Sequence, residues 1–87
     1  MPQYISPPMD SNRLSDDQRI RYPYAVCLIV GDRPMVAQLH TTETAATKAA
    51  ATLDRAERKR GSASGYPVMA LLLNSSPKEL RAKAATI

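Results

Sequence analysis

The sequence has no tryptophan and no phenylalanine, and it has only one cysteine, Cys27. Without these large side chains, much of the apolar content comes from alanine, and alanine contacts bury little area. A single cysteine excludes an intrachain disulfide, which favours a reducing, cytoplasmic location over secretion. The first residues show neither the basic nor the apolar region of a signal peptide, and this points to the same location.

Long apolar runs and the common enzymatic motifs are missing too. The longest apolar runs, residues 24–30 and 68–73, fall far short of the roughly 20 residues that a membrane span needs. The chain has no G-x-x-x-x-G-K, G-x-G-x-x-G, H-E-x-x-H or C-x-x-C motif. One histidine and one cysteine cannot form a tetrahedral zinc site without two carboxylates from elsewhere. We therefore expect no membrane span, no metal and no cofactor.

The length of 87 residues predicts a single small domain. A domain of this size buries only about 60–65% of the surface that its unfolded chain exposes, so we expect one layer of helix on one sheet. Ligand pockets typically occupy about 300–1,000 Å³, and such a core leaves no room for a deep one. The small core and the missing motifs together predict that the protein is not an enzyme and has no catalytic residues.

Three prolines and few apolar residues near the N-terminus predict a mobile arm over residues 1–14. The rest, residues 15–87, is predicted to form one α+β domain. Ser15 and Gln18 fit a capping box that would start one short helical turn. That turn must end before Pro23, because the residue before a proline avoids the helical region.

Three segments have the pattern of β-strands. Residues 24–30 are continuously apolar, which is typical of a central strand that is covered on both faces. Residues 31–34 read as a hairpin loop, and residues 35–40 then alternate, with His40 on the side away from the core. Residues 68–73 form the third, uncharged strand.

The main helix is predicted from Thr41 or Thr42, either of which can cap it, to about Lys59 or Arg60. At about 100° per residue, its apolar stripe consists of Ala45, Ala46, Ala49, Ala50, Leu53 and Ala56. After a flexible linker, a second capping box of Ser76 and Glu79, with Pro77 at the first helical position, starts a short C-terminal helix. This order predicts a ββαβ(α) fold, in which a three-stranded antiparallel sheet of order 2-1-3 carries the main helix on one face.

Cys27 and His40 are the only candidates for a nucleophile and its base. Cys27 falls in the middle of the buried strand, where a thiol is usually inert. His40 ends an amphipathic strand on its non-core face, where a solvated or capping histidine is expected. Their predicted positions argue against a catalytic pair.

Basic residues are the more informative group. Around the main helix, Lys48, Arg55 and Lys59 fall within about 40° of each other, whereas the acidic residues lie on another flank. The topology also predicts that the hairpin loop and the helix C-terminus meet at one end of the domain. A candidate anion-binding or partner-binding site then consists of Arg33, Lys48, Arg55, Arg58, Lys59, Arg60 and Tyr66. The alternative is that Arg58, Lys59 and Arg60 only complement the helix dipole.

The sheet edges are a second candidate surface. Residues 35–40 and 68–73 would each lie at an edge and could accept a strand from a partner or from a second copy of the chain. Because residues 68–73 carry no charge, we expect the C-terminal helix, the arm or a partner to cover that edge.

In size and in the strand–strand–helix–strand order of residues 24–73, the chain resembles the small phage-encoded inhibitor proteins of the anti-CRISPR type. The resemblance implies a phage or mobile-element accessory protein that blocks a nucleic-acid machine by occupying its surface. The net charge of +4 excludes simple mimicry of nucleic acid. The leading hypothesis is a non-enzymatic inhibitor or adaptor that docks on a protein or nucleoprotein through a charged helix or a sheet edge. The alternative is a sequence-independent nucleic-acid-binding protein that uses the basic residues.

Overall fold

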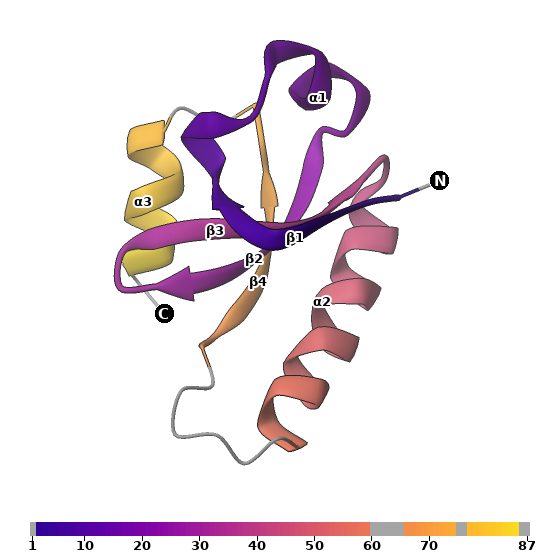
Figure 1. The fold of residues 1–87 in the computed structure, drawn as a ribbon, viewed down its shortest axis with the longest axis vertical. Helices are drawn as coiled ribbons and strands as arrows, with labels where there is room; N and C mark the ends of the chain where they lie inside the picture. The colour runs from indigo at the N-terminus through magenta and orange to yellow at the C-terminus, as the bar shows by residue number, and fades with distance from the viewer. Residues whose placement is uncertain (1, 60–65, 75–76, 86–87) are drawn as a thin grey trace.

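The computed structural model describes residues 2–59, 66–74 and 77–85. The α+β class is confirmed, with a four-stranded antiparallel sheet of order β1-β3-β2-β4 and helices packed against it (Figure 1). In chain order the elements are β1 (Gln3–Asp10), the 3-10 helix η1 (Ser11–Arg13), α1 (Asp16–Arg21), β2 (Tyr24–Val30), β3 (Arg33–His40), α2 (Glu43–Lys59), β4 (Val68–Leu72) and α3 (Pro77–Ala85).

The predicted strand order 2-1-3 is present as β3-β2-β4, but the prediction of a mobile N-terminal arm was wrong. Residues 3–10 form β1, which pairs with β3 at both of its ends. Between Tyr4 and Met9 the strand bulges, because five steps along β1 correspond to two steps along β3. The bulge contains Pro7 and Pro8, which cannot donate to a strand ladder and therefore hide the strand in the sequence.

Local signals in the sequence define several element ends correctly. The Ser15 hydroxyl accepts a hydrogen bond from the Gln18 backbone at 3.1 Å, and the Gln18 side chain accepts one from the Ser15 backbone at 3.0 Å. The Thr42 hydroxyl accepts from the Ala45 N–H at 3.2 Å and caps α2. α3 begins at Pro77 as predicted, while the expected capping residue Ser76 lies outside the described residues.

One face of the sheet is covered by α2. Ala46 and Ala50 are buried against Val26 of the central strand, and Ala49 and Leu53 pack beside them. Four members of the predicted apolar stripe therefore lie in this cluster, while Ala56 at the end of the stripe is exposed. Since alanine side chains are short, the helix can approach the strands closely.

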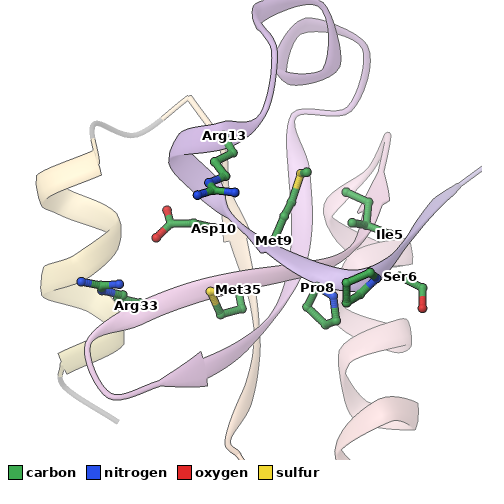
Figure 2. A pocket seen from close by; sticks show the side chains of 9 residues that line it. Ile5, Ser6, Pro8, Met9, Asp10, Arg13, Arg33 and Met35 are labelled. Carbon is green, nitrogen blue, oxygen red and sulfur yellow. The ribbon is translucent and has the colours of Figure 1, made fainter.

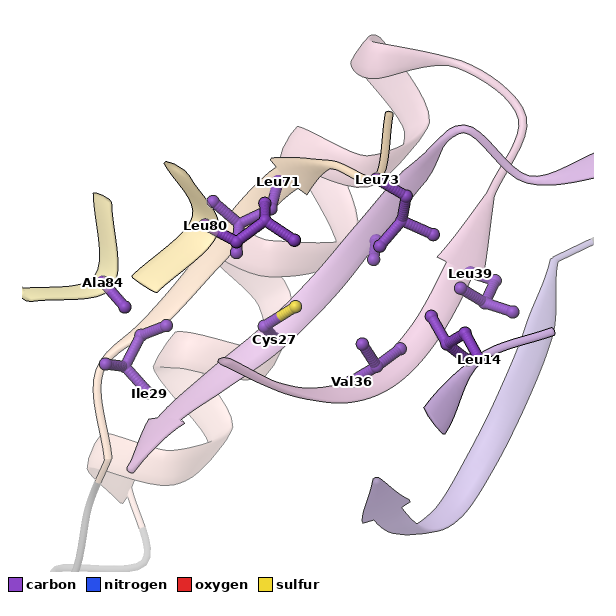
Figure 3. Close-up of a cluster of buried hydrophobic side chains, with 10 residues drawn as sticks. Leu14, Cys27, Ile29, Val36, Leu39, Leu71, Leu73, Leu80 and Ala84 are labelled. Atoms are coloured by element: carbon purple, nitrogen blue, oxygen red, sulfur yellow. The ribbon is translucent and has the colours of Figure 1, made fainter. Parts of the chain in front are cut away.

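The opposite face carries the larger cluster (Figure 3). Leu80 and Ala84 of α3 pack there against Cys27 and Ile29 of β2, and Leu14 covers the side near β3. The expectation of a single helical layer was therefore wrong, because the C-terminal helix and the N-terminal segment cover the second face. The guanidinium group of Arg19 donates to the carbonyl oxygens of Ser11 and Leu73 and so ties this segment to the end of β4.

The predicted alternation along β3 is broken by a bulge. The pairing of β2 with β3 shifts between Val26 and Cys27, whose partners are Gln38 and Val36, so Ala37 is the extra residue. Val36 and Leu39 consequently lie in the same core cluster, although they are three residues apart. Strict alternation along residues 35–40 places Val36 on the same side as His40, away from the core, and this prediction was wrong because one extra residue reverses the alternation.

Leu14→Ala tests whether the N-terminal segment belongs to the fold. The Leu14 side chain is 5% exposed in the main cluster, so its truncation should lower the free energy of unfolding by about 2–5 kcal/mol. The matched control is Ile20→Ala, because Ile20 is 79% exposed and its truncation should change stability by about 0.5 kcal/mol or less. Urea unfolding followed by circular dichroism measures both, and equal stability of the two variants would contradict the packing of Leu14.

Candidate partner-binding surface

Cys27 is fully buried in the centre of β2, on the face covered by α3. Loss of hydration on burial raises the pKa of its thiol to about 12. A thiol with this pKa stays protonated at neutral pH, and the thiolate is the form that reacts. The expectation of an inert core cysteine agrees with this environment.

His40 is also buried, with 6% of its surface exposed, so of the two expected roles, solvated or capping, the solvated one was wrong. It pairs across the ladder with Tyr24, which packs with the α2-side cluster. Its Nε2 lies 2.9 Å from Oε1 of Gln38, and burial lowers the pKa of the imidazole. Cross-strand partners share a face and successive residues alternate, so His40 and Cys27 point to opposite faces of the sheet. They cannot act together as a base and a nucleophile.

The described residues offer neither a metal site nor a membrane-spanning helix. No group of three or more histidine, cysteine, aspartate or glutamate side chains within residues 2–59, 66–74 and 77–85 could hold a metal ion. In the same residues, no helix is long and apolar enough to cross a membrane.

The outer face of α2 carries three exposed cations, Lys48, Arg55 and Lys59, which we call the cationic ridge. They lie within about 40° of each other and opposite the buried alanines, so their side chains project away from the sheet. Of the acidic residues on this helix, Asp54 forms an ion pair with Arg58 at 3.1 Å. Arg58 is thus partly neutralised within its own helix and lies beside the ridge rather than on it.

Arg33 does not join this ridge. It lies at the start of β3, in the hairpin, whereas the C-terminal end of α2 lies at another corner of the molecule (Figure 1). Arg33 instead lines a groove of about 590 Å³ beside the β1 bulge, together with Met35, Asp10 and Arg13. Figure 2 shows the Asp10 carboxylate between the two guanidinium groups in this view. Arg13 was missed as a candidate because residues 1–14 were taken for an arm.

The remaining predicted site residues lie elsewhere. Tyr66 is 44% exposed and precedes Pro67, whose carbonyl oxygen accepts a hydrogen bond from Ile29 at 2.8 Å. Tyr66 therefore lies beside the hairpin end of β2. Arg60 lies outside the described residues.

The sheet edges differ from the predicted pair. β3 is not an edge, because β1 pairs along it, so the edges are β1 and β4. The β1 edge is interrupted by a bulge with two prolines, which hinders the addition of another strand. β4 pairs with β2 in an unbroken register and contains neither a proline nor a charge.

Comparisons with known proteins assign no family to this chain. No family model, no curated protein and no solved structure matches it.

Burial of Cys27 predicts that its thiol does not react in the folded protein. At about pH 8, Ellman's reagent should give no colour with the native chain and one equivalent after unfolding in denaturant. An Ala51→Cys variant is the control, because residue 51 is exposed on α2 and its thiol should react at once. Reaction of native Cys27 at the rate of the control thiol would contradict the buried position.

His40 predicts a loss of stability on mild acidification. The unfolded state takes up a proton near the ordinary histidine pKa of about 6.5, whereas burial lowers the pKa in the folded state. The stability that comes from keeping His40 neutral is therefore fully present above the pKa of the unfolded state. It is lost as the pH falls toward the lower pKa of the folded state. Urea midpoints at about pH 7.5 and 5.5 should differ more for the natural chain than for His40→Gln. An equal shift of the urea midpoint in both proteins would contradict this role of His40.

Proposed function

We propose that this chain is a non-enzymatic binding protein that docks onto a protein or nucleoprotein partner through the cationic ridge of α2. The observation that carries the proposal is the exposure of Lys48, Arg55 and Lys59 together on the face of the helix opposite its buried alanines. Such a surface favours a partner with an acidic face.

The charges of α2 are segregated in a way that suits recognition. The acidic residues Glu43, Asp54 and Glu57 lie toward the flank beside β4 or near the sheet, and Asp54 pairs with Arg58 rather than with the ridge. Salt bridges between exposed residues of one helix contribute little to stability. The ridge also lies away from the acidic flank, so its cations are not neutralised by these carboxylates. Its field is therefore directed to solvent, where it can steer an acidic partner into contact.

The side chains between these cations are small. Thr44, Ala51 and Thr52 are exposed on the same side of the helix, so no bulky group separates a partner from the ridge. A partner surface can then approach closely, and the guanidinium group of Arg55 can bind a carboxylate or a phosphate with two parallel hydrogen bonds. The ridge thus offers charge and one directional contact.

The non-enzymatic part of the proposal is supported by the two candidate reactive side chains. Cys27 and His40 are both buried and lie on opposite faces of the sheet. The groove beside the β1 bulge offers Arg13, Arg33 and Asp10, which provide charge but no activated nucleophile.

An inhibitor or adaptor is the role we favour. The resemblance to small phage-encoded inhibitors implies a cytoplasmic protein that acts by covering the surface of a nucleic-acid machine. A basic ridge suits an acidic protein face or the exposed phosphates of a nucleoprotein.

A sequence-independent nucleic-acid-binding protein is the second candidate function, and the same ridge favours it. Three cations that each contact a phosphate would give a log–log salt dependence of roughly −3 on duplex DNA. Binding to a labelled duplex that is absent at low salt, or that does not change with salt, would exclude this candidate.

Neutralising the ridge should abolish partner binding without unfolding the protein. The variant carries Lys48→Gln, Arg55→Gln and Lys59→Gln. The matched control carries Arg21→Gln, Lys78→Gln and Arg81→Gln, which remove the same formal charge from exposed positions on α1 and α3. Natural, ridge and control chains serve as baits for capture from the native host, each with and without nuclease. We expect a protein that is retained after nuclease by the natural and control baits and is lost from the ridge bait.

Two outcomes would overturn the leading proposal. Recovery of nucleic acid alone, with all protein lost after nuclease, would favour the second candidate function. Equal capture by the ridge bait and the control bait would show that the ridge is not the docking surface.

A further inference from the structure

Among the described residues, no strand pairs with the outer side of β4, so this edge of the sheet can accept a further strand. Backbone groups in an antiparallel ladder point alternately toward the neighbouring strand and away from it. At the two ends of the β2–β4 ladder, Pro67 accepts a hydrogen bond from Ile29, and Leu73 donates one to Pro23 at 2.7 Å. The odd-numbered residues of β4 therefore face β2. Val68, Ala70 and Leu72 direct their N–H and C=O groups outward.

We infer that β4 pairs antiparallel with β4 of a second copy of this chain and joins two sheets into one. In the register centred on Ala70, Val68 lies opposite Leu72 of the partner subunit, and Ala70 lies opposite Ala70 of the partner subunit. The outward-facing residues then meet each other, and each such pair exchanges two backbone hydrogen bonds. No charge or proline of β4 opposes the pairing.

A pocket beside Leu72 favours this register. The Leu72 side chain is 37% exposed, and it lines a pocket of about 260 Å³ with Tyr24, Glu43, Thr47 and Lys83. Val68 of the partner subunit would be placed beside Leu72, at the mouth of this pocket. The pairing would thus cover an apolar side chain that the isolated chain leaves partly in water.

Charged side chains of both signs flank the edge, with Glu43 of α2 and Lys83 of α3 beside Leu72. Glu43 and Thr47 of α2 line the same pocket as Leu72, so this flank of the helix lies over β4. A two-fold axis at Ala70 makes the two α2 helices antiparallel neighbours. Glu43, in the first turn, then faces the last turn of the other helix, which carries Arg58 of the partner subunit. Across the axis the helix dipoles are antiparallel, and Arg58 of the partner subunit lies between its own ion-pair partner Asp54 and Glu43 of the first chain, while the cationic ridge remains on the outer surface.

The dimer is tested by measuring the mass of the protein in solution and by substituting residues on the two edges of the sheet. Sedimentation equilibrium of the full chain should give twice the monomer mass of 9.5 kDa at high concentration and dissociation on dilution. Leu72→Lys should raise the dissociation constant roughly 100-fold or more, because it places an unpaired charge in the contact. Ala70→Pro should do the same, because it removes an outward N–H that the monomer does not use. Tyr4→Lys on the β1 edge is the control and should leave the mass unchanged.

Amide exchange provides a readout that a merely destabilised variant would not imitate. The N–H groups of Val68, Ala70 and Leu72 should be protected at high concentration and should lose that protection on dilution, while the inward N–H groups of Met69 and Leu71 stay protected. A chain that remains monomeric at millimolar concentration would overturn the inference. So would a dimer that is unaffected by either β4 variant, or outward amides whose protection does not depend on concentration.

Discussion

The whole fold depends on covering both faces of β2. This central strand has an apolar side chain at every position, with Val26 directed to one face and Cys27 and Ile29 to the other. A strand of this kind is stable only when each face is removed from water. The rest of the chain supplies that cover, with α2 on one side and α3 together with Leu14 on the other.

This requirement explains which parts of the fold could be predicted. Residues 24–30, the capping box of Ser15 and Gln18, and the alanine stripe are local patterns, and each corresponds to the structure. β1 could not be predicted in this way, because its contributions are non-local. Ile5 and Met9 are separated by prolines, and they gain their stability from packing against a core that forms elsewhere in the chain. Composition alone therefore predicts a mobile arm for residues 1–14.

The errors at the candidate site have a similar cause. The extra residue in β3 reverses the faces of its two halves, and no residue type at Ala37 marks the bulge in advance. Arg33 and the end of α2 were expected to converge because the chain returns to the same end of the sheet, but the helix and the hairpin end at different corners (Figure 1). The ridge itself could be predicted because it depends only on helical periodicity, which is the most local of these patterns.

The same covering constraint leaves the protein with two unequal edges. Residues 3–10 close the β3 side of the sheet and end it in a bulge with two prolines, a device that prevents further pairing. β4 itself contains no proline and no bulge, although it is the more apolar edge, and the charged side chains beside it, Glu43 and Lys83, come from α2 and α3. If edge-to-edge contact were only a hazard, the protective prolines would be expected on that side as well. Their restriction to β1 is understandable if the β4 edge is kept regular for a partner, and a partner strand there leaves the cationic ridge on α2 exposed.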